Sequence, residues 1–319
     1  MERFVPLNII MLLIDMYKFS TAVVNWNGCI SLPYQIFAGV RQGGSISPAI
    51  FAVYVNSVIE KLKQHDLGCS MGHTYLGVIM YADDLLLVSG SICNLQKMID
   101  QCLLEFLSLD LNINAKKSVC VRIGQRHNAE CTRISVGGTQ ISWSTSFRYL
   151  GVTIRSGSAF TVDCKPVRAK FYRSFNSLFS KIPKADEHII VSLVKTYCIS
   201  LVLYSLEAVC LNRGSFNQLD SMLLNAFGKI FKSFERSILL HCMYYMNCLP
   251  LSSLYYKKRF YFLSKLAFNP NPIVNTFFGI SGKHELQSLA ESLGVNANCR
   301  NVNTSAWNAF ALSIGIDNQ

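Results

Sequence analysis

Apolar and polar positions follow two different patterns along this chain, and the pattern changes near residue 158. Before that point, short alternating or continuously apolar runs predict strands, because successive side chains of a strand point to opposite faces. Beyond it, apolar residues recur three and four positions apart, which predicts helices. The chain is therefore expected to be α+β, with a mixed first part and an all-helical second part.

The first part reads as hairpins interleaved with helices, and Asn27-Gly28 is a strong two-residue turn signal. The expected elements are a helix that begins at Pro6, a hairpin of 21–26 and 29–37, a helix from Pro48 to Gln64, a hairpin of strands 76–80 and 85–88, a helix over 94–108, a strand over 119–123, a short hairpin at Gly137-Gly138 and a strand over 148–154.

The second part follows a short polar break, Arg155–Ser158, which we take as a domain boundary. The expected helices there cover 166–180, 187–211, 216–234 and 252–268. From Asn269 the chain is polar and opens with Asn-Pro-Asn-Pro, so its order is left open. The expected division is thus 1–157, 158–268 and a tail, 269–319.

Charge is unevenly distributed over these parts. The formal net charge is +11, yet residues 1–110 hold six Lys/Arg and nine Asp/Glu, so the excess of positive charge lies in the remainder. An acidic region followed by a basic one suits a chemical site joined to a surface for a polyanion. An ordinary solvated basic face gives the same numbers, and charge alone leaves both open.

Cysteines and apolar runs bear on the compartment. The twelve cysteines are scattered without a CxxC pair, and no signal peptide is seen, so reduced thiols in a nuclear or cytoplasmic protein are expected. The run 5–14 is too short to cross a membrane, and 189–209 contains Lys195 and Glu207. Both are interpreted as buried helices, and no membrane partner is expected.

The strongest candidate for a catalytic site is Tyr81-Ala82-Asp83-Asp84, which joins two apolar strands. Two adjacent carboxylates without a nearby Lys or Arg repel each other unless cations join them. Magnesium prefers oxygen ligands and bridges substrate phosphates. A pair of such ions, about 3.5–4 Å apart, stabilises the attacking and leaving oxygens of phosphoryl transfer. An ordinary acidic turn is the alternative.

Other motifs surround this tip in a fixed order. Gly39–Pro48 is a glycine-rich loop that leads into a helix, where backbone amides can approach a ligand closely. After the acidic tip come Asn114–Ser118 and then Arg148–Val152. Each motif alone is weak evidence, but chance seldom produces the whole series.

This series resembles the palm motifs of reverse transcriptases. The residues within the motifs are most similar to those of LINE-type (non-LTR) retrotransposon enzymes. The likeness runs from about Pro6 to about residue 265. It implies a partial palm followed by a helical thumb, and template-directed transfer of a nucleotide from a dNTP to the 3′ end of a DNA primer on an RNA template. Two Mg²⁺ ions are the implied cofactors, with Mn²⁺ as an alternative.

The resemblance assigns roles residue by residue. Asp83 and Asp84 match the catalytic, metal-holding aspartates, and Tyr149-Leu150-Gly151 resembles the segment that introduces the primer grip. The expected nucleotide and template contacts are Arg41, Gln42, Gly43, Gly44, Tyr81 and Lys117.

The sequence departs from the family at its front, where the first palm motif and its aspartate are expected. Asp15 stands in a segment with helical spacing and is rejected as a substitute. We therefore expect an N-terminally truncated polymerase, inactive without the missing N-terminal part. Two alternatives stay open: a non-catalytic, nucleic-acid-binding retrotransposon remnant, and a polymerase of the group II intron type.

A basic helical stretch is the remaining candidate site. Its aromatic residues, Phe171, Tyr172, Phe175 and Phe179, are expected to form a buried stripe. Its basic residues are then free to follow the phosphates of a template–primer duplex, and the candidates are Arg168, Lys170, Arg173 and Lys181. The cluster Tyr255–Arg259 fits the same role less well.

Overall fold

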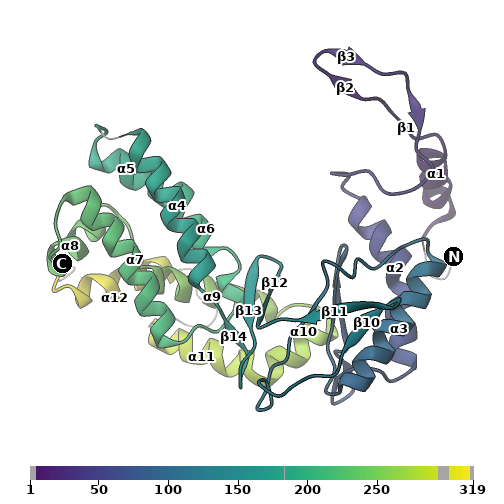
Figure 1. Ribbon diagram of the computed structural model, residues 1–319. Helices are drawn as coiled ribbons and strands as arrows, with labels where there is room; N and C mark the ends of the chain where they lie inside the picture. Colours follow the sequence, from purple (N-terminus) through teal and green to yellow (C-terminus); the bar gives the residue numbers. More distant parts are fainter. Residues whose placement is uncertain (1–4, 183, 294–301, 317–319) are drawn as a thin grey trace.

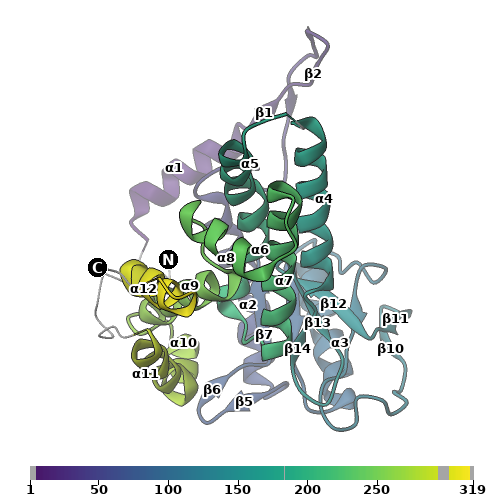
Figure 2. The same cartoon turned by 90° about the vertical axis from the view of Figure 1, so that its left-hand side faces the viewer.

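A computed structural model describes residues 5–182, 184–293 and 302–316. Strands and two long helices form one end of the molecule, a set of packed helices forms the other, and an arm of residues 5–46 projects from the first end (Figures 1 and 2). The expected α+β class is confirmed.

The first end contains short, mostly antiparallel strands. In the arm, α1 (Leu7–Lys18) is followed by β1 (Thr21–Ala22) paired with β4 (Tyr34–Gln35) and β2 (Asn25–Trp26) paired with β3 (Cys29–Ile30). Helix α1 buries none of its residues, so the expectation of a buried helix over 5–14 is wrong. Then come α2 (Ser47–Gln64), the hairpin β5 (Ser70–Met71) and β6 (Thr74–Tyr75), the hairpin β7 (Val78–Tyr81) and β8 (Asp84–Leu87), and α3 (Ile92–Ser108). The last strands are β9 (Val119–Cys120), β10 (Ile134–Val136), β11 (Thr139–Trp143), β12 (Ser146–Tyr149), β13 (Val152–Arg155) and β14 (Thr161–Val162).

Helices α2 and α3 hold the β7–β8 hairpin by burying apolar residues at helical spacing. Proline at the start of α2 suits the first turn, where no intrahelical N–H bond is lost. The shared cluster contains Val58 and Leu62 of α2, Met98 and Phe106 of α3, and Val78 of β7. A second cluster joins α3 to β10 and β11, and β9 pairs with β11 in parallel.

The second end is helical, as expected. Its helices are α4 (Lys165–Lys181), α5 (Glu187–Leu193), η1 (Val194–Ile199, a π-helix), α6 (Ser200–Leu203), η2 (Leu206–Ala208, a 3₁₀-helix), α7 (Arg213–Phe231), α8 (Arg236–Tyr245), α9 (Leu251–Leu266), α10 (Pro272–Phe277), η3 (Phe278–Gly282, a π-helix), α11 (Lys283–Ser292) and α12 (Val302–Ser313). Helix α8 was not predicted, and α10 to α12 fall in the tail whose order was left open.

The expectation of one continuous helix over 187–211 is wrong. A π-helical turn interrupts it, α6 ends at Leu203, and Ser205 has a left-handed backbone with φ of 60°. Contacts distant in sequence fix this break. Tyr204 lies against Gly151, where an added Cβ would come within 2.8 Å of its ring, and Arg259 donates to the carbonyl of Glu207 at 2.8 Å.

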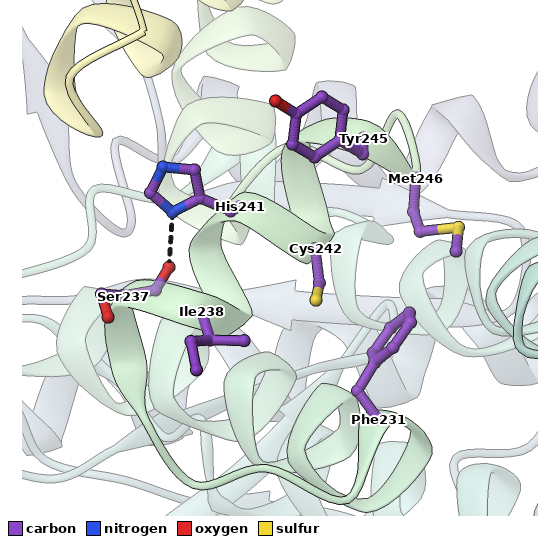
Figure 3. Close-up of a pocket in the computed structure, with 7 residues that line it drawn as sticks. All are labelled: Phe231, Ser237, Ile238, His241, Cys242, Tyr245 and Met246. Carbon is purple, nitrogen blue, oxygen red and sulfur yellow. Dashed lines mark hydrogen bonds between the residues drawn. The ribbon is translucent and has the colours of Figure 1, made fainter.

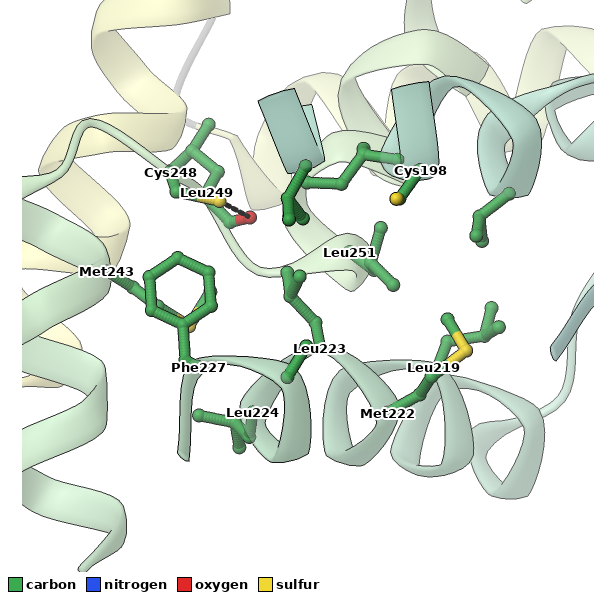
Figure 4. Packing of buried hydrophobic residues seen from close by; sticks show 14 of the residues in the cluster. Cys198, Leu219, Met222, Leu223, Leu224, Phe227, Met243, Cys248, Leu249 and Leu251 are labelled. Atoms are coloured by element: carbon green, nitrogen blue, oxygen red, sulfur yellow. Dashed lines mark hydrogen bonds between the residues drawn. The ribbon is translucent and has the colours of Figure 1, made fainter. Parts of the chain in front are cut away.

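The largest core lies among these helices (Figure 4). Phe171 and Phe175 of α4, Leu223 and Phe227 of α7, and Met243 of α8 are essentially fully buried in it. This confirms the expected buried aromatic stripe of α4 for Phe171 and Phe175, while Tyr172 and Phe179 are half-buried and pack against the same core. Each phenylalanine there buries enough apolar surface to contribute about 1.5–3 kcal/mol to stability.

One helical stretch within the described residues, Glu187–Ala208, is long and apolar enough to cross a bilayer. Its residues Val194, Cys198 and Val202 are fully buried in the core shared with α4 and α7, and a core helix passes the same test of length and composition.

The two ends of the molecule also touch through the C-terminal part. Helix α10 packs on β6, and the hydroxyls of Thr74 and Thr276 are 2.9 Å apart. The division at 157/158 and the extent of the tail stay predictions.

The cysteines give a test of this core. Among the described residues all cysteines are free thiols, and burial raises the pKa of Cys102 and of Cys248 to about 12. At pH 8 only about one in ten thousand of such thiols is ionised, and the thiolate is the reactive form. We expect iodoacetamide to label exposed Cys29, Cys93 and Cys210 in the native protein and to spare Cys102 and Cys248. Mass spectrometry checks this; labelling of Cys102 as fast as Cys93 would contradict the packing described.

Candidate functional site

The acidic tip is a two-residue β-hairpin turn. Tyr81 of β7 pairs with Asp84 of β8, which leaves Ala82 and Asp83 as the turn. Ala82 has a φ of 51°, whereas the φ of Asp83 is not positive. A positive φ at the first turn residue alone is typical of a type II′ turn. Glycine is the usual residue at the first position, so alanine holds the tip in a strained conformation of order 1–2 kcal/mol.

Strand alternation decides where the two carboxylates lie. Met80 and Leu85 form one cross-strand pair and pack on the α2–α3 cluster. The neighbouring pair, Tyr81 and Asp84, must then lie on the opposite, outer face. Asp83 and Asp84 are both exposed, and Tyr81 is 65% exposed. The hairpin therefore presents two adjacent carboxylates to solvent on the face away from the core.

Asp83 and Asp84 provide the type of ligand that a divalent metal prefers, but two carboxylates are too few ligands to complete a metal site. Hard carboxylate oxygens are the ligands that Mg²⁺ prefers, and it is octahedral. Within residues 5–182, 184–293 and 302–316, however, no group of three or more Asp, Glu, His or Cys side chains could hold a metal ion. Asp15 lies exposed on α1 and is part of no such group. Asp83 and Asp84 can thus supply part of a metal site.

The glycine-rich loop forms a compact turn before α2. The amide of Gly44 donates to the carbonyl of Arg41 at 3.1 Å, and the Ser47 hydroxyl donates to the same carbonyl at 2.7 Å. A Cβ on Gly44 would lie 2.6 Å from the Ser47 hydroxyl, so a larger residue would displace this hydroxyl from its hydrogen bond to Arg41. The Arg41 guanidinium donates to Ser20 at 3.3 Å, while Gln42 and Gly43 are exposed.

Lys117 also lies in a turn that its neighbours stabilise. The Lys117 amide donates to the Asn114 carbonyl at 3.1 Å and to its side-chain oxygen at 3.2 Å, and the Ser118 hydroxyl donates to the same carbonyl at 2.9 Å. The Lys117 side chain is exposed just before β9. The local folds of this turn and of the glycine-rich loop are clear, but none of the contacts described here joins either of them to Asp83 or Asp84.

One residue outside the expected metal and nucleotide contacts, Tyr149, lies near the acidic tip. Burial raises the pKa of the Tyr149 hydroxyl, and the nearby Asp84 carboxylate raises it further. The Tyr149 hydroxyl oxygen is buried and has no hydrogen-bond partner among the described residues. It ends β12, directly before the Leu150-Gly151 turn on which Tyr204 packs. The structure thus brings Tyr149 to the acidic hairpin, and local sequence patterns could not predict this proximity.

The basic face of α4 is well formed. Lys165, Lys170, Arg173 and Lys181 are exposed, and their positions lie away from the buried Phe171 and Phe175, with Arg173 opposite them. No Asp or Glu occurs within α4. This helix therefore presents four positive charges along one solvent-facing side.

Two other basic candidates have structural roles. Arg168 is half-buried and donates to Gln218 of α7 at 3.0 Å, and its buried Nε atom has no partner among the described residues. Arg259 is 7% exposed and forms a bidentate pair with Glu285 of α11, at 2.8 and 2.6 Å. Both guanidinium groups hold helices together, so of the four candidates on α4 Lys170, Arg173 and Lys181 are the exposed ones.

Comparison with known proteins gives a family match and two partial relatives. Residues 5–154 match the family model described as reverse transcriptase (RNA-dependent DNA polymerase). The chain is 27% identical over 159 residues to a retrovirus-related Pol polyprotein from the type-2 retrotransposable element R2DM of Drosophila melanogaster. This match covers 47% of the chain and 15% of the relative. The chain is 22% identical over 201 residues to the Pol polyprotein from a type-1 retrotransposable element R2 of Popillia japonica, covering 60% of this chain and 32% of the relative. The chain thus spans less than a third of either relative.

The strained turn yields a stability prediction. Replacing Ala82 by Gly should raise the free energy of unfolding by about 0.5–1 kcal/mol, since relief of the positive φ outweighs the greater freedom of glycine in the unfolded chain. Ala82→Val should lower it, because a β-branched residue tolerates positive φ still less. Urea denaturation measures both. If Ala82→Gly lost stability, the turn would not have the conformation described.

Proposed function

Residues 5–154 belong to the reverse transcriptase family, and on that premise we propose that this chain is part of an RNA-directed DNA polymerase of a non-LTR retrotransposon. The observation that carries the proposal is the pair of carboxylates, Asp83 and Asp84, exposed on the outer face of the β7–β8 hairpin within the family match. The reaction is addition of a nucleotide from a dNTP to a primer 3′ end on an RNA template.

Each proposed site residue has a separate task. Asp83 and Asp84 hold divalent metal, Mg²⁺ by preference and Mn²⁺ as a substitute, which when bound supplies positive charge to the phosphates. Tyr81, on the same outer face as Asp84, borders the place of the incoming nucleotide. Gln42, Gly43 and Gly44 shape the nucleotide and template contact, Arg41 closes their turn, and Lys117 neutralises phosphate charge.

We further propose that another stretch of polypeptide completes this site. Two carboxylates are too few to bind two ions in full. Helix α1 buries none of its residues, although Leu7, Leu12 and Ile14 make it apolar on several sides. A helix that is hydrophobic all round is normally enclosed by protein. A polypeptide that covers the arm and adds a carboxylate next to β7–β8 accounts for both features, and the chain alone is then inactive.

We propose that the helical thumb binds the template–primer duplex and takes no part in nucleotide transfer. Lys170, Arg173 and Lys181 of α4 are proposed to follow the phosphates of the template–primer duplex. The alternative function, a remnant that binds nucleic acid without polymerising, is favoured by this same basic face together with the incomplete metal site.

Primer extension tests the catalytic proposal. We expect this chain to extend a DNA primer on RNA little above background, and a longer protein that supplies the upstream palm to extend it readily. In the longer protein Asp83→Asn should lower the rate by at least about 100-fold, because positioning and electrostatics provide most of the catalysis. Asp110→Asn, a matched change at another exposed carboxylate, should have no effect.

Two results would contradict this reading. Extension by the chain as given would mean that its own residues complete the metal site. A longer protein that binds the duplex without extending the primer would favour the non-catalytic alternative.

Salt dependence tests the basic face. Removing one phosphate contact, by Lys170→Gln or Arg173→Gln, should weaken duplex binding on all sequences and reduce the slope of log K against log salt by roughly one. Lys63→Gln on α2 is the control for loss of a positive charge. Fluorescence anisotropy at several salt concentrations gives the slopes. Unchanged slopes in both α4 variants would remove α4 from the interface.

A further inference from the structure

Buried polar atoms without a hydrogen-bond partner mark places where a folded chain points to a missing contact, because such atoms are rare and costly. The apolar pocket of about 430 Å³ beside α8 is not such a place, since His241 Nδ1 lies 2.8 Å from the Ser237 carbonyl oxygen (Figure 3). The Ser237 hydroxyl in turn donates to Glu235 at 2.6 Å. Among the described residues, buried side-chain atoms without a partner occur in Tyr17, Tyr149, Arg168 and Glu207. The hydroxyl of Tyr149 is the one that lies beside the acidic tip, near Asp84.

Strand alternation directs the Tyr149 side chain inward. Tyr149 pairs with Val152 across the β12–β13 hairpin. Ile154, two residues along β13, shares this face and is buried, whereas Arg148 lies on the opposite face and is exposed. The Tyr149 hydroxyl therefore lies within the fold, and its exposed neighbours are the residues of this strand that a primer could touch.

The turn that follows Tyr149 holds the tyrosine in place. Leu150 and Gly151 have φ of 46° and 88°, and two positive values are typical of a type I′ turn. Leucine is unfavourable at positive φ, so the turn needs support from outside. The Tyr204 ring supplies it by lying so close to Gly151 that an added Cβ would come within 2.8 Å.

Asp84 is an acceptor without a partner of its own. Its side chain is exposed, and no hydrogen bond or ion pair of its carboxylate occurs among the described residues. The side chain is therefore free to rotate toward Tyr149. A tyrosine hydroxyl is protonated at neutral pH and can donate, and a hydrogen bond to an ionised carboxylate is stronger than one to a neutral group.

We propose that Tyr149 is a positioning residue of the metal site: its buried hydroxyl donates to one oxygen of the Asp84 carboxylate and leaves the other oxygen for the metal. The inference rests on the proposed function and adds to the site a residue outside its expected metal and nucleotide contacts. Hydrogen bonds of this kind orient metal-ligating carboxylates, and their loss typically lowers metal affinity or activity about 10–100-fold.

Binding of Mn²⁺ tests this role without catalysis. The protein is the longer polymerase that supplies the upstream palm, and the probe is Mn²⁺ alone, with the free ion measured by electron paramagnetic resonance. Tyr149→Phe removes the hydroxyl and keeps the ring, and we expect it to raise the Kd for Mn²⁺ about tenfold or more. Primer extension should slow by a similar factor at low Mg²⁺ and recover at high Mg²⁺, while the Kd for primer–template stays unchanged.

The matched control is Tyr17→Phe, which removes a hydroxyl that is likewise buried without a partner but belongs to α1. It should leave the affinity for Mn²⁺ unchanged. If Tyr149→Phe binds Mn²⁺ as tightly as the parent while Asp83→Asn binds it weakly, the positioning role is refuted and the proposed metal site stands. If Tyr149→Phe weakens primer–template binding alone, the hydroxyl contacts the primer and the inference is overturned. If neither Tyr149→Phe nor Asp83→Asn changes Mn²⁺ binding, the metal site is wrong and the inference fails with it.

Discussion

Burial of one face of the β7–β8 hairpin against α2 and α3 is the constraint on which the candidate site depends. Val78 is buried, and Leu85 and Leu87 pack on the same helices. Because side chains alternate along a strand, a slip of one residue would carry Asp84 into this apolar cluster and move leucines to solvent. An unpaired carboxylate in such surroundings is very costly, so packing at the core fixes the direction in which the acidic tip faces.

Features encoded by neighbouring residues could be predicted from the sequence, whereas those decided by distant contacts could not. The β7–β8 hairpin and α2 follow from alternation, helical spacing and a proline at the first turn, all of which are local. Arg168 and Arg259 carry the same local signal as an exposed basic residue. Their burial is decided by Gln218 and Glu285, on helices that come much later in the chain. Tyr149 could not be placed beside Asp84 for the same reason.

The arm shows what the packed part of the chain does not supply. Trp26 is 76% and Phe37 88% exposed, and two-stranded ribbons such as β1–β4 and β2–β3 are marginally stable by themselves in water. Apolar patches of this extent usually mark a surface that other protein covers. At about 25 cal/mol per Å² of apolar surface, covering the arm would release considerable free energy. The polypeptide that we propose covers the arm is the natural source of a further strand beside the hairpin, since unpaired strand edges accept such additions.

The short segment from Tyr204 to Val209 links the end of the molecule that carries the acidic β7–β8 hairpin to the basic helices. Tyr204 packs on Gly151, two residues after the tyrosine that lies near Asp84. A few residues later, Arg259 and Tyr255 of α9 donate to the backbone carbonyls of Glu207 and Val209. The left-handed conformation of Ser205 is unfavourable for a non-glycine residue, so these contacts must hold it in place. Since α6 also packs on α4, the same few residues position the basic face of α4 relative to the acidic tip.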